Sequence, residues 1–266
     1  MATDSGSSGG TVINDGRGRS KNGVYPSASA TISDFRERAS MLGNEFSILD
    51  YHWYVLQMLY LVEYADYDSQ TKLGKGVTEN NDDAIIMGGA DSLGMKSGCL
   101  INDGTHSMIY RGIEDIYGNT GDFLDGINIR NYQAYINYDF TTYKSDTFDG
   151  IYKTLGYINT SSRGFITKLG YDSNNPLIGL PIDATLTDPN TPSGIKDLYL
   201  GNSGDKILFV GGAYYNNSNF AGLWFSRAAD RSDYARSGVS SRLIRHQTSG
   251  GWEVANPQEG SSSGGK

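Results

Sequence analysis

Apolar and polar residues alternate in several short segments of the chain, with turn-forming residues between them. Residues 132–138 alternate in this way and are predicted to pair, through Arg130-Asn131, with the apolar fragment 127–129. Further short strands are predicted at 123–124, 153–158, 165–169, 198–200 and 207–210. Clusters rich in Asn, Asp and Pro separate them, which is typical of turns. The second half of the chain is therefore expected to consist of short strands and long loops.

Two segments before residue 66 carry apolar residues at helical spacing instead. A short helix is predicted between Ser33 as its N-cap and Gly43 as its end. A second helix is predicted over about 48–64, where Ser47 and Asp50 resemble a capping box. Apolar residues surround most of this second helix, so we expect it to be buried on several sides. It is too short and too polar to span a membrane.

The stretch between these regions is polar and rich in glycine. Residues 66–107 are predicted to form long loops, with short strands within them as the alternative, and the acidic run 79–83 is interpreted as a solvated turn because it lacks the spacing of a calcium loop. Residues 111–117 are predicted to form a short helix that Gly118 ends. Two N-terminal helices followed by short strands and long loops give an α+β fold class.

Glycine and serine dominate both ends of the chain. Residues 1–30 and 249–266 are too polar to bury a core, so they are predicted to be a flexible arm and a flexible tail. The domain between them is predicted to span 31–248, with its binding module at about 208–245. The first residues have neither a charged nor an apolar leader region, so no secretory signal peptide is expected.

Charge and composition exclude several function classes. The net charge is −8, which disfavours a nucleic-acid partner because phosphates require a basic surface. Cys99 is the only cysteine, so neither an internal disulfide nor a cysteine zinc site is possible, and it is expected to be a small buried apolar residue. His52, His106 and His246 lack metal-ligand spacing. We therefore expect no metal and no cofactor.

The composition of one stretch differs from that of the rest. No Lys and no Glu occurs between Ile207 and Trp252, where Tyr, Asn, Ser, Arg and Asp accumulate. Tyr and Trp give large rigid contact areas, and Ser, Gly and Asn give adaptable hydrogen bonds, as in binding surfaces. A system of Gly/Asn/Ser-rich loops at the end of the domain fits the same composition.

Two sequence blocks carry a resemblance to a known family. They are YRGIEDIYGNTGDFLDGINI at 110–129 and FVGGAYYNNSNFAGLWF at 209–225, the latter followed by GVSSRLIR at 238–245. Together they resemble the variable proteins of diversity-generating retroelements, which have a C-type-lectin-like fold of the formylglycine-generating-enzyme superfamily. The resemblance covers roughly 32–246. The chain departs from the family pattern at 118–123, which has fewer aromatic residues, and at 239–242.

The resemblance implies a face of exchangeable residues held by a fixed frame. Its frame positions would be Gly211, Gly212, Gly222, Leu223, Arg242 and Leu243, with Arg242 as a buried, hydrogen-bonded anchor. The candidate contact residues are Tyr214, Tyr215, Asn216, Asn219, Phe220, Trp224, Ser226, Arg227, Ala229, Asp230, Asp233, Tyr234 and Arg236. Tyr214 also fits a structural aromatic position, and Trp224 or its neighbour Phe225 also fits a place in the core.

Enzymatic chemistry finds little support in the sequence. Formylglycine-generating chemistry requires cysteines near the C-terminal region, and this chain has none there. Between residues 31 and 248 no nucleophile elbow G-x-S-x-G occurs, and residues 201–206 lack the spacing of a phosphate-binding loop. A glycosidase could use any two of the 30 acidic residues, which sequence alone does not exclude.

The expected function is therefore non-catalytic binding of a ligand or receptor. In a phage the protein would be a tail-fibre receptor-binding protein on the virion, attached by its N-terminal arm and contacting a host surface protein or glycan. A bacterial cell surface is the other expected location. A homo-oligomer, with a trimer favoured, would provide avidity. The alternative is a structural decoration or assembly protein of the virion.

Overall fold

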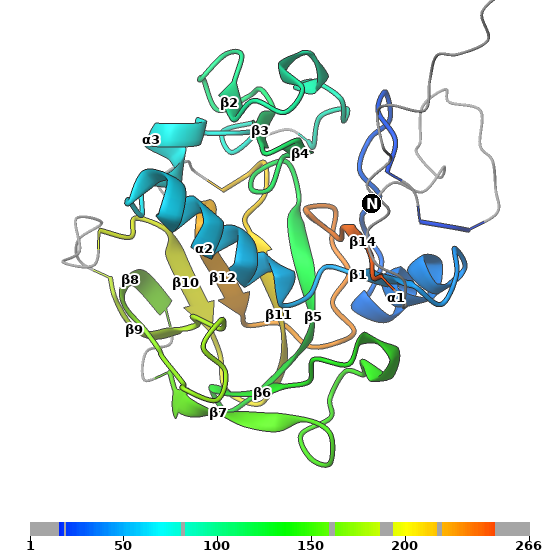
Figure 1. Cartoon of the computed structure of the whole chain (residues 1–266), viewed down its shortest axis with the longest axis vertical. Helices are drawn as coiled ribbons and strands as arrows, with labels where there is room; N and C mark the ends of the chain where they lie inside the picture. Colours follow the sequence, from blue (N-terminus) through cyan, green and yellow to red (C-terminus); the bar gives the residue numbers. More distant parts are fainter. Residues whose placement is uncertain are drawn as a thin grey trace, which may run out of the picture.

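The computed structural model describes residues 16–18, 20–80, 83–159, 163–186, 194–216 and 220–247. Within these residues the chain is a mixed α+β structure with few helices and many strands (Figure 1). The helices are α1 (Ile32–Ser40), α2 (His52–Tyr64) and α3 (Ser69–Leu73), with 3-10 turns η1 (Asp91–Leu93) and η2 (Phe140–Thr142). The strands are β1 (Phe46–Ile48), β2 (Gly98–Cys99), β3 (Met108–Tyr110), β4 (Ile113–Glu114), β5 (Gly121–Arg130), β6 (Gln133–Ile136), β7 (Lys153–Ile158), β8 (Arg163–Leu169), β9 (Pro181–Thr185), β10 (Leu198–Gly201), β11 (Asp205–Gly211), β12 (Gly222–Ala228), β13 (Val239–Ser240) and β14 (Leu243–Arg245).

Most of the described strands belong to one curled sheet. Its order is β7-β6-β5-β11-β12-β10-β8-β9, and β13 pairs with β5 outside this path. The neighbours are antiparallel except for β10 with β12 and β13 with β5, which are parallel. A small sheet joins β2, β3 and β4, and another joins β1 to β14. The last described strand therefore lies beside the first, so the two ends of the described domain meet.

The central strands bury both of their faces. On β11, Leu208 and Val210 belong to the core beneath α2, whereas Ile207 and Phe209 belong to the core beneath α1. The same alternation separates Phe123 from its neighbour Leu124 on β5. Because successive side chains of a strand point to opposite faces, a continuously apolar strand requires cover on both sides. In Figure 1, α2 lies across β10, β12 and β11 and provides one of these covers.

Helix α1 begins with a capping box, although at a different residue from the one predicted. Thr31 is the N-cap, its hydroxyl accepts the Asp34 backbone N–H at 3.2 Å, and the Asp34 carboxylate accepts the Thr31 N–H at 2.8 Å. The prediction of Ser33 as N-cap is wrong, because the reciprocal pair needs an acidic residue three positions after the cap. From this helix, Arg36 reaches Asp125 of β5.

The expectation of two N-terminal helices is not borne out. The segment predicted as one helix from Ile48 divides into β1 and α2, and a third helix, α3, follows. Ile48 pairs with Leu243 of β14, so a partner strand almost 200 residues away determines its conformation. Helix α2 begins only at His52, whose backbone N–H donates to Asp50 Oδ1 at 3.1 Å.

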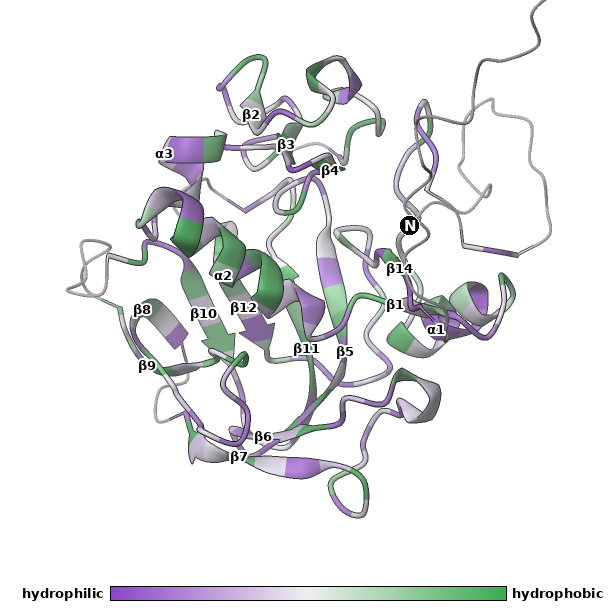
Figure 2. Cartoon of the chain, in the orientation of Figure 1, coloured by the Kyte–Doolittle hydropathy of each residue, from purple (hydrophilic) through white to green (hydrophobic). Residues whose placement is uncertain are grey.

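Helix α2 buries one stripe and leaves an apolar outer side. Trp53, Tyr54 and Tyr60 point into the core, and the buried Gln57 donates to the Leu223 carbonyl at 2.7 Å. Val62 is 85% exposed, and Met58 and Leu59 are 45% and 37% exposed. The prediction that the helix is buried on several sides is therefore wrong. Figure 2 shows apolar residues along the visible side of α2 and on β10 behind it. No helix of the described residues is long and apolar enough to cross a membrane.

Several strand predictions are confirmed. The hairpin of β5 and β6 pairs Ile127 with Ile136, and β7, β8, β10 and β11 include the segments predicted for them. The helix predicted at 111–117 is wrong. Arg111 and Gly112 both have positive φ, 51° and 80°, and form the two-residue turn of the β3–β4 hairpin. Such a turn matches the twist of antiparallel strands, and a helix requires negative φ.

Residues 20–30 of the predicted arm are attached to the domain. Gly23 N donates to Met87 O at 2.8 Å, Met87 N donates to Val24 O at 3.0 Å, and Ser29 N donates to Arg236 O at 3.0 Å. Residues 1–15 and the predicted tail 249–266 lie outside the described residues. The described part of the arm thus follows the surface of the domain up to the predicted binding module.

Candidate functional site

The predicted binding module is built around the close pair of strands β11 and β12. Gly212 has φ of +79°, and a Cβ there would lie 2.7 Å from the Ala221 Cβ, so the chain needs glycine at this turn. At Gly222 a Cβ would lie 2.4 Å from the Asp197 carboxylate. That carboxylate is buried and accepts the Trp224 backbone N–H at 2.7 Å. Asp197 therefore holds the start of β12 in place.

Strand β12 is a core strand. Trp224 is 2% exposed and packs edge-on against Tyr60 and Tyr67, with ring centroids 5.4 and 5.2 Å apart. Phe225 and Ser226 are also buried, at 1% and 4%. The prediction that Trp224 and Ser226 are contact residues is therefore wrong, because β12 lies inside the curled sheet between β11 and β10. Both rings of the Trp-Phe pair belong to the core.

Tyr214 is a structural aromatic residue. It is 7% exposed, its backbone N–H donates to Asn119 O at 3.0 Å, and its hydroxyl lies 3.2 Å from Ser237 Oγ. The ring packs against Val77 and Ala84 in a small separate core. Of the two interpretations of Tyr214 from the sequence, the core position is confirmed.

Four of the predicted contact residues form a cluster at the surface. Arg227 Nη2 donates to Asp230 Oδ1 at 3.0 Å, and its guanidinium carbon lies 6.0 Å from the Tyr234 ring centroid. Tyr234 stacks on the buried Phe209 with 6.0 Å between centroids and 16° between planes. Tyr215 is 45% exposed and joins the same cluster electrostatically. We call Tyr215, Arg227, Asp230 and Tyr234 the contact face.

The contact face combines neutral tyrosine hydroxyls with a hydrogen-bonded ion pair. Loss of water around its hydroxyl, with the neighbouring Tyr234 as the next cause, raises the pKa of Tyr215 to about 12. The hydrogen bond to Asp230 raises the pKa of Arg227 above its already high value. At neutral pH the face therefore presents two phenol hydroxyls and one guanidinium–carboxylate pair.

The remaining predicted contact residues occupy different environments. Asp233 and Arg236 are exposed, Ala229 is half-buried, and Asn216 is half-buried and accepts the Ala213 N–H at 2.8 Å. Phe220 is half-buried against Phe165, on the side of the α1 core. Asn219 lies outside the described residues. Asp233 and Arg236 thus extend the contact face, Asn216 holds the turn before it, and Phe220 packs away from it against Phe165.

Arg242 anchors the module to the other sequence block. Its Nε donates to Asp122 Oδ2 of β5 at 2.5 Å, and its Nη1 donates to Glu114 O at 2.7 Å. Its Nη2 donates to the Asp115 carbonyl. The Asp122 side chain is only 4% exposed, so this is a largely desolvated charge pair. The predicted hydrogen bonds of Arg242 are confirmed, but its own side chain is 24% exposed, so it is a partly buried anchor rather than a buried one.

The buried carboxyl of Asp197 makes stability depend on pH. Burial raises its pKa from 3.8 to about 8, so between these values the folded chain holds a proton that the unfolded chain has lost. Stability must then fall as pH rises, by about 1.4 kcal/mol per unit for this group. When the pH is raised from 5 to 8, the free energy of unfolding of the natural chain should fall on the order of 4 kcal/mol more than that of the Asp197→Asn variant. Urea unfolding at the two pH values measures this difference, and equal losses would contradict it.

A second polar cluster was not predicted from the sequence. The buried Asp50 binds His52 Nδ1 at 2.5 Å and accepts the Tyr143 hydroxyl at 3.1 Å. His246 lies beside them, with Nε2 2.7 Å from Ser47 Oγ. The Ser47 hydroxyl donates to the Ile48 carbonyl, so it accepts from His246 and is not an activated nucleophile. Two histidines that are almost 200 residues apart can be brought together only by the β1–β14 pairing.

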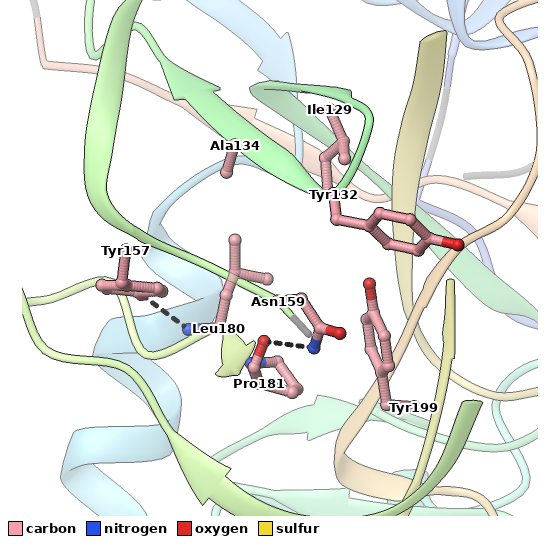
Figure 3. Close-up of a pocket in the computed structure, with 8 residues that line it drawn as sticks. All are labelled: Ile129, Tyr132, Ala134, Tyr157, Asn159, Leu180, Pro181 and Tyr199. Atoms are coloured by element: carbon pink, nitrogen blue, oxygen red, sulfur yellow. Dashed lines mark hydrogen bonds between the residues drawn. The ribbon is translucent and has the colours of Figure 1, made fainter. Parts of the chain in front are cut away.

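Two further features of the described residues argue against a metal site and against a ligand site in one small cavity. No group of three or more His, Cys, Asp or Glu in this part of the chain could hold a metal ion. The small cavity in Figure 3 has a volume of about 10 Å³, room for one water molecule at most. Two of its polar groups are paired: Asn159 Nδ2 donates to Pro181 O at 2.7 Å, and the Tyr157 hydroxyl accepts the Leu180 N–H at 3.1 Å. Cys99 is unpaired and only half-buried, so the prediction of a fully buried residue is wrong.

No family model matches the chain, and no curated protein matches it. Its function must therefore be inferred from the residues and contacts of the chain itself.

Proposed function

We propose that the chain is a non-catalytic receptor-binding protein whose ligand binds to the contact face. The observation that carries this proposal is the division of the Lys- and Glu-free stretch into two kinds of residue. Gly212, Gly222 and Trp224 form a rigid buried frame, and Tyr215 and Tyr234 remain accessible above it. Tyr and Arg are the residue types that most often dominate binding energy at protein interfaces.

The contact face is ordered before any ligand arrives. Asp230 holds Arg227, Phe209 supports Tyr234, and Tyr215 lies so close to Gly238 that a Cβ there would come within 2.2 Å of its ring. Side chains that are already immobile lose little conformational entropy on binding. The packing of the face therefore favours specific recognition of a partner of complementary shape.

We further propose that the protein is a variable protein of the diversity-generating retroelement type with a C-type-lectin-like fold. In support, the two sequence blocks that carry the resemblance are joined in space. Strand β5 of the first block pairs with β11 of the second, for example Leu124 with Leu208, and Arg242 bonds to Asp122. The residues that resemble frame positions therefore hold the exposed residues from below.

In a phage, such a protein would stand at the tip of a tail fibre and contact a host surface protein or glycan. The N-terminal arm would attach it to the virion, and a trimer would add avidity to weak single contacts. If the protein is cellular instead, it would lie on the bacterial surface and bind its ligand through the same contact face.

The diversification part of the proposal is tested on the DNA that flanks the gene. We expect a near-duplicate of codons 211–245 beside a reverse-transcriptase gene, with differences concentrated at adenines. The codons for Tyr215, Arg227, Asp230 and Tyr234 should differ between the copies, and those for Gly212 and Trp224 should not. A single copy without a neighbouring reverse transcriptase would contradict diversification and leave receptor binding to be tested by adsorption.

A structural role in the virion is the second candidate. The outer side of α2 favours it, because Met58, Leu59 and Val62 are exposed without charged residues between them. Exposed apolar patches often mark protein–protein interfaces. In that case α2 or the contact face would be covered by other chains in the assembled particle.

A further inference from the structure

A second, much larger cleft among the described residues lies away from the contact face. It has a volume of about 540 Å³ and separates residues 20–22 from the first turns of α2, β4 and β14. This volume is within the range of small-molecule sites, about 300–1,000 Å³. None of the four contact-face residues lines it, so a role of the cleft is independent of the proposed receptor binding.

One wall of the cleft is aliphatic. It is formed by Leu49, Val55, Leu56, Ile113, Leu243 and Ile244. Among the described lining residues the imidazole of His52 is the only ring, so stacking on an aromatic surface is not provided. Sugars and nucleobases are usually bound with such stacking, whereas a hydrocarbon chain gains from aliphatic contact alone.

Two of the charged groups in the cleft are already engaged by the protein. The Glu114 carboxylate accepts the backbone N–H groups of Gly88 and Ala90 at 2.7 and 2.8 Å. The Arg242 guanidinium donates to Asp122 and to two main-chain carbonyls. These bonds fix the position of both groups, and those of Arg242 use three of its five N–H donors.

His52 differs from these groups. Its Nδ1 is held by Asp50, which is fully buried and fixed in turn by Tyr143, and its side chain is 42% exposed. Its Nε2 makes no hydrogen bond to any described residue. The hydrogen bond to Asp50 is the main cause that raises the pKa of His52, which favours the imidazolium with an N–H at Nε2. Asp50 thus fixes the orientation of the imidazole, and its Nε2–H is a partly exposed hydrogen-bond donor at the edge of an aliphatic cleft.

We propose that this cleft binds an aliphatic carboxylate, with its hydrocarbon chain against the wall around Leu56 and its carboxylate accepting a hydrogen bond from His52 Nε2. The charge of the imidazolium complements that of the carboxylate, and the Asp50 contact fixes the orientation of the ring. A charge-assisted hydrogen bond is about twice as strong as a neutral one, so the acid is preferred over the alcohol of equal length.

Isothermal titration calorimetry with decanoate, below its micelle concentration, tests the proposal on the full chain. We expect saturable binding at one site per chain and affinity that rises roughly fourfold for each CH₂ from hexanoate to decanoate. Decanol is expected to bind about tenfold or more weakly than decanoate. Affinity that does not depend on chain length, or equal affinity for decanol, would overturn the proposal.

Two variants locate the site. Leu56→Asn is expected to weaken decanoate binding at least about tenfold. Leu59→Asn, on the same helix but outside the cleft, is the matched control and is expected to leave it unchanged. His52→Gln removes the positive charge and is expected to weaken decanoate about tenfold while leaving decanol unaffected.

Two outcomes besides a lack of binding would overturn the assignment. Equal effects of Leu56→Asn and Leu59→Asn would mean that the ligand does not occupy the cleft. A fall in the sedimentation coefficient with Leu56→Asn alone, without decanoate, would assign the cleft to contacts with a second copy of the chain. Thermal unfolding of each variant confirms that the fold is retained before binding is compared.

Discussion

Replacing Tyr215, Arg227 and Tyr234 together by alanine is expected to weaken receptor binding by at least about 100-fold. Each of these residue types can contribute about 2 kcal/mol or more at the centre of an interface, and the three lie in one cluster. Adsorption of the particle that carries the protein to its host cells measures the effect. Normal adsorption of the triple variant would contradict the proposed function.

Matched substitutions outside the contact face provide the control. Tyr138 and Tyr171 are 42% and 73% exposed, and Arg245 is exposed on β14. Their triple alanine variant removes the same side-chain types and is expected to adsorb within about twofold of the natural protein, since few surface residues are hot spots.

Loss of packing must be separated from loss of contact. Tyr234 stacks on Phe209, so its removal also exposes part of the core beneath α1. Tyr234→Leu keeps an apolar side chain there, and we expect it to unfold close to the temperature of the natural chain while still weakening adsorption. If Tyr234→Ala weakens adsorption but Tyr234→Leu adsorbs normally, Tyr234 acts by packing and belongs to the frame.

The second large effect concerns the anchor of the module. Arg242→Met is expected to destabilise the fold by about 3–5 kcal/mol, the range for breaking a buried ion pair by removing one partner. The Asp122 carboxylate would be left 4% exposed without its partner, and the carbonyls of Glu114 and Asp115 would each lose a donor. The midpoint of urea unfolding measures the change.

A surface pair serves as the control for Arg242. Arg130 also bonds to a carboxylate through two nitrogens, at 2.7 and 2.8 Å to Asp205, but both side chains are more than 40% exposed. Exposed pairs contribute about 0–1 kcal/mol, so Arg130→Met should have a small effect. Equal destabilisation by the two variants would show that Arg242 is not a partly buried anchor.

The sequence predicted strands best where partners are local and one side is polar. The β5–β6 hairpin and β7 have nearby partners, and their alternation is visible in the sequence. The strand β1 was missed because its partner is β14, almost 200 residues away. A pairing of this kind leaves no local pattern in the chain.

Buried polar residues explain the other failures. Strand β5 was predicted as two fragments because Asp125 and Gly126 separate its apolar residues, yet Asp125 is buried beside Arg36, as Asp122 is beside Arg242. No strand was predicted at β12, and its Trp224, Ser226 and Arg227 were counted as contact residues because Trp, Ser and Arg match a binding-surface composition. Composition does not distinguish a side chain that points outward from one that points inward, and this is why Trp224 was misplaced.

The candidate site was therefore predictable in part. The exposed residues Tyr215, Asp233 and Arg236 and the anchor Arg242 were identified from composition and resemblance. The cleft beside His52 was not, because its lining comes from five separate segments whose meeting depends on the tertiary fold.

Hydroxyl-radical footprinting of Tyr215 and Tyr234 in the assembled particle tests the central claim most directly. Receptor binding requires these rings to point outward, whereas an assembly role requires them to be covered by other chains. We predict that both tyrosines are oxidised in the particle as fast as in the isolated protein, and that soluble receptor or host-cell envelopes protect them. Protection in the particle alone, with no further change on adding host envelopes, would contradict receptor binding and support assembly.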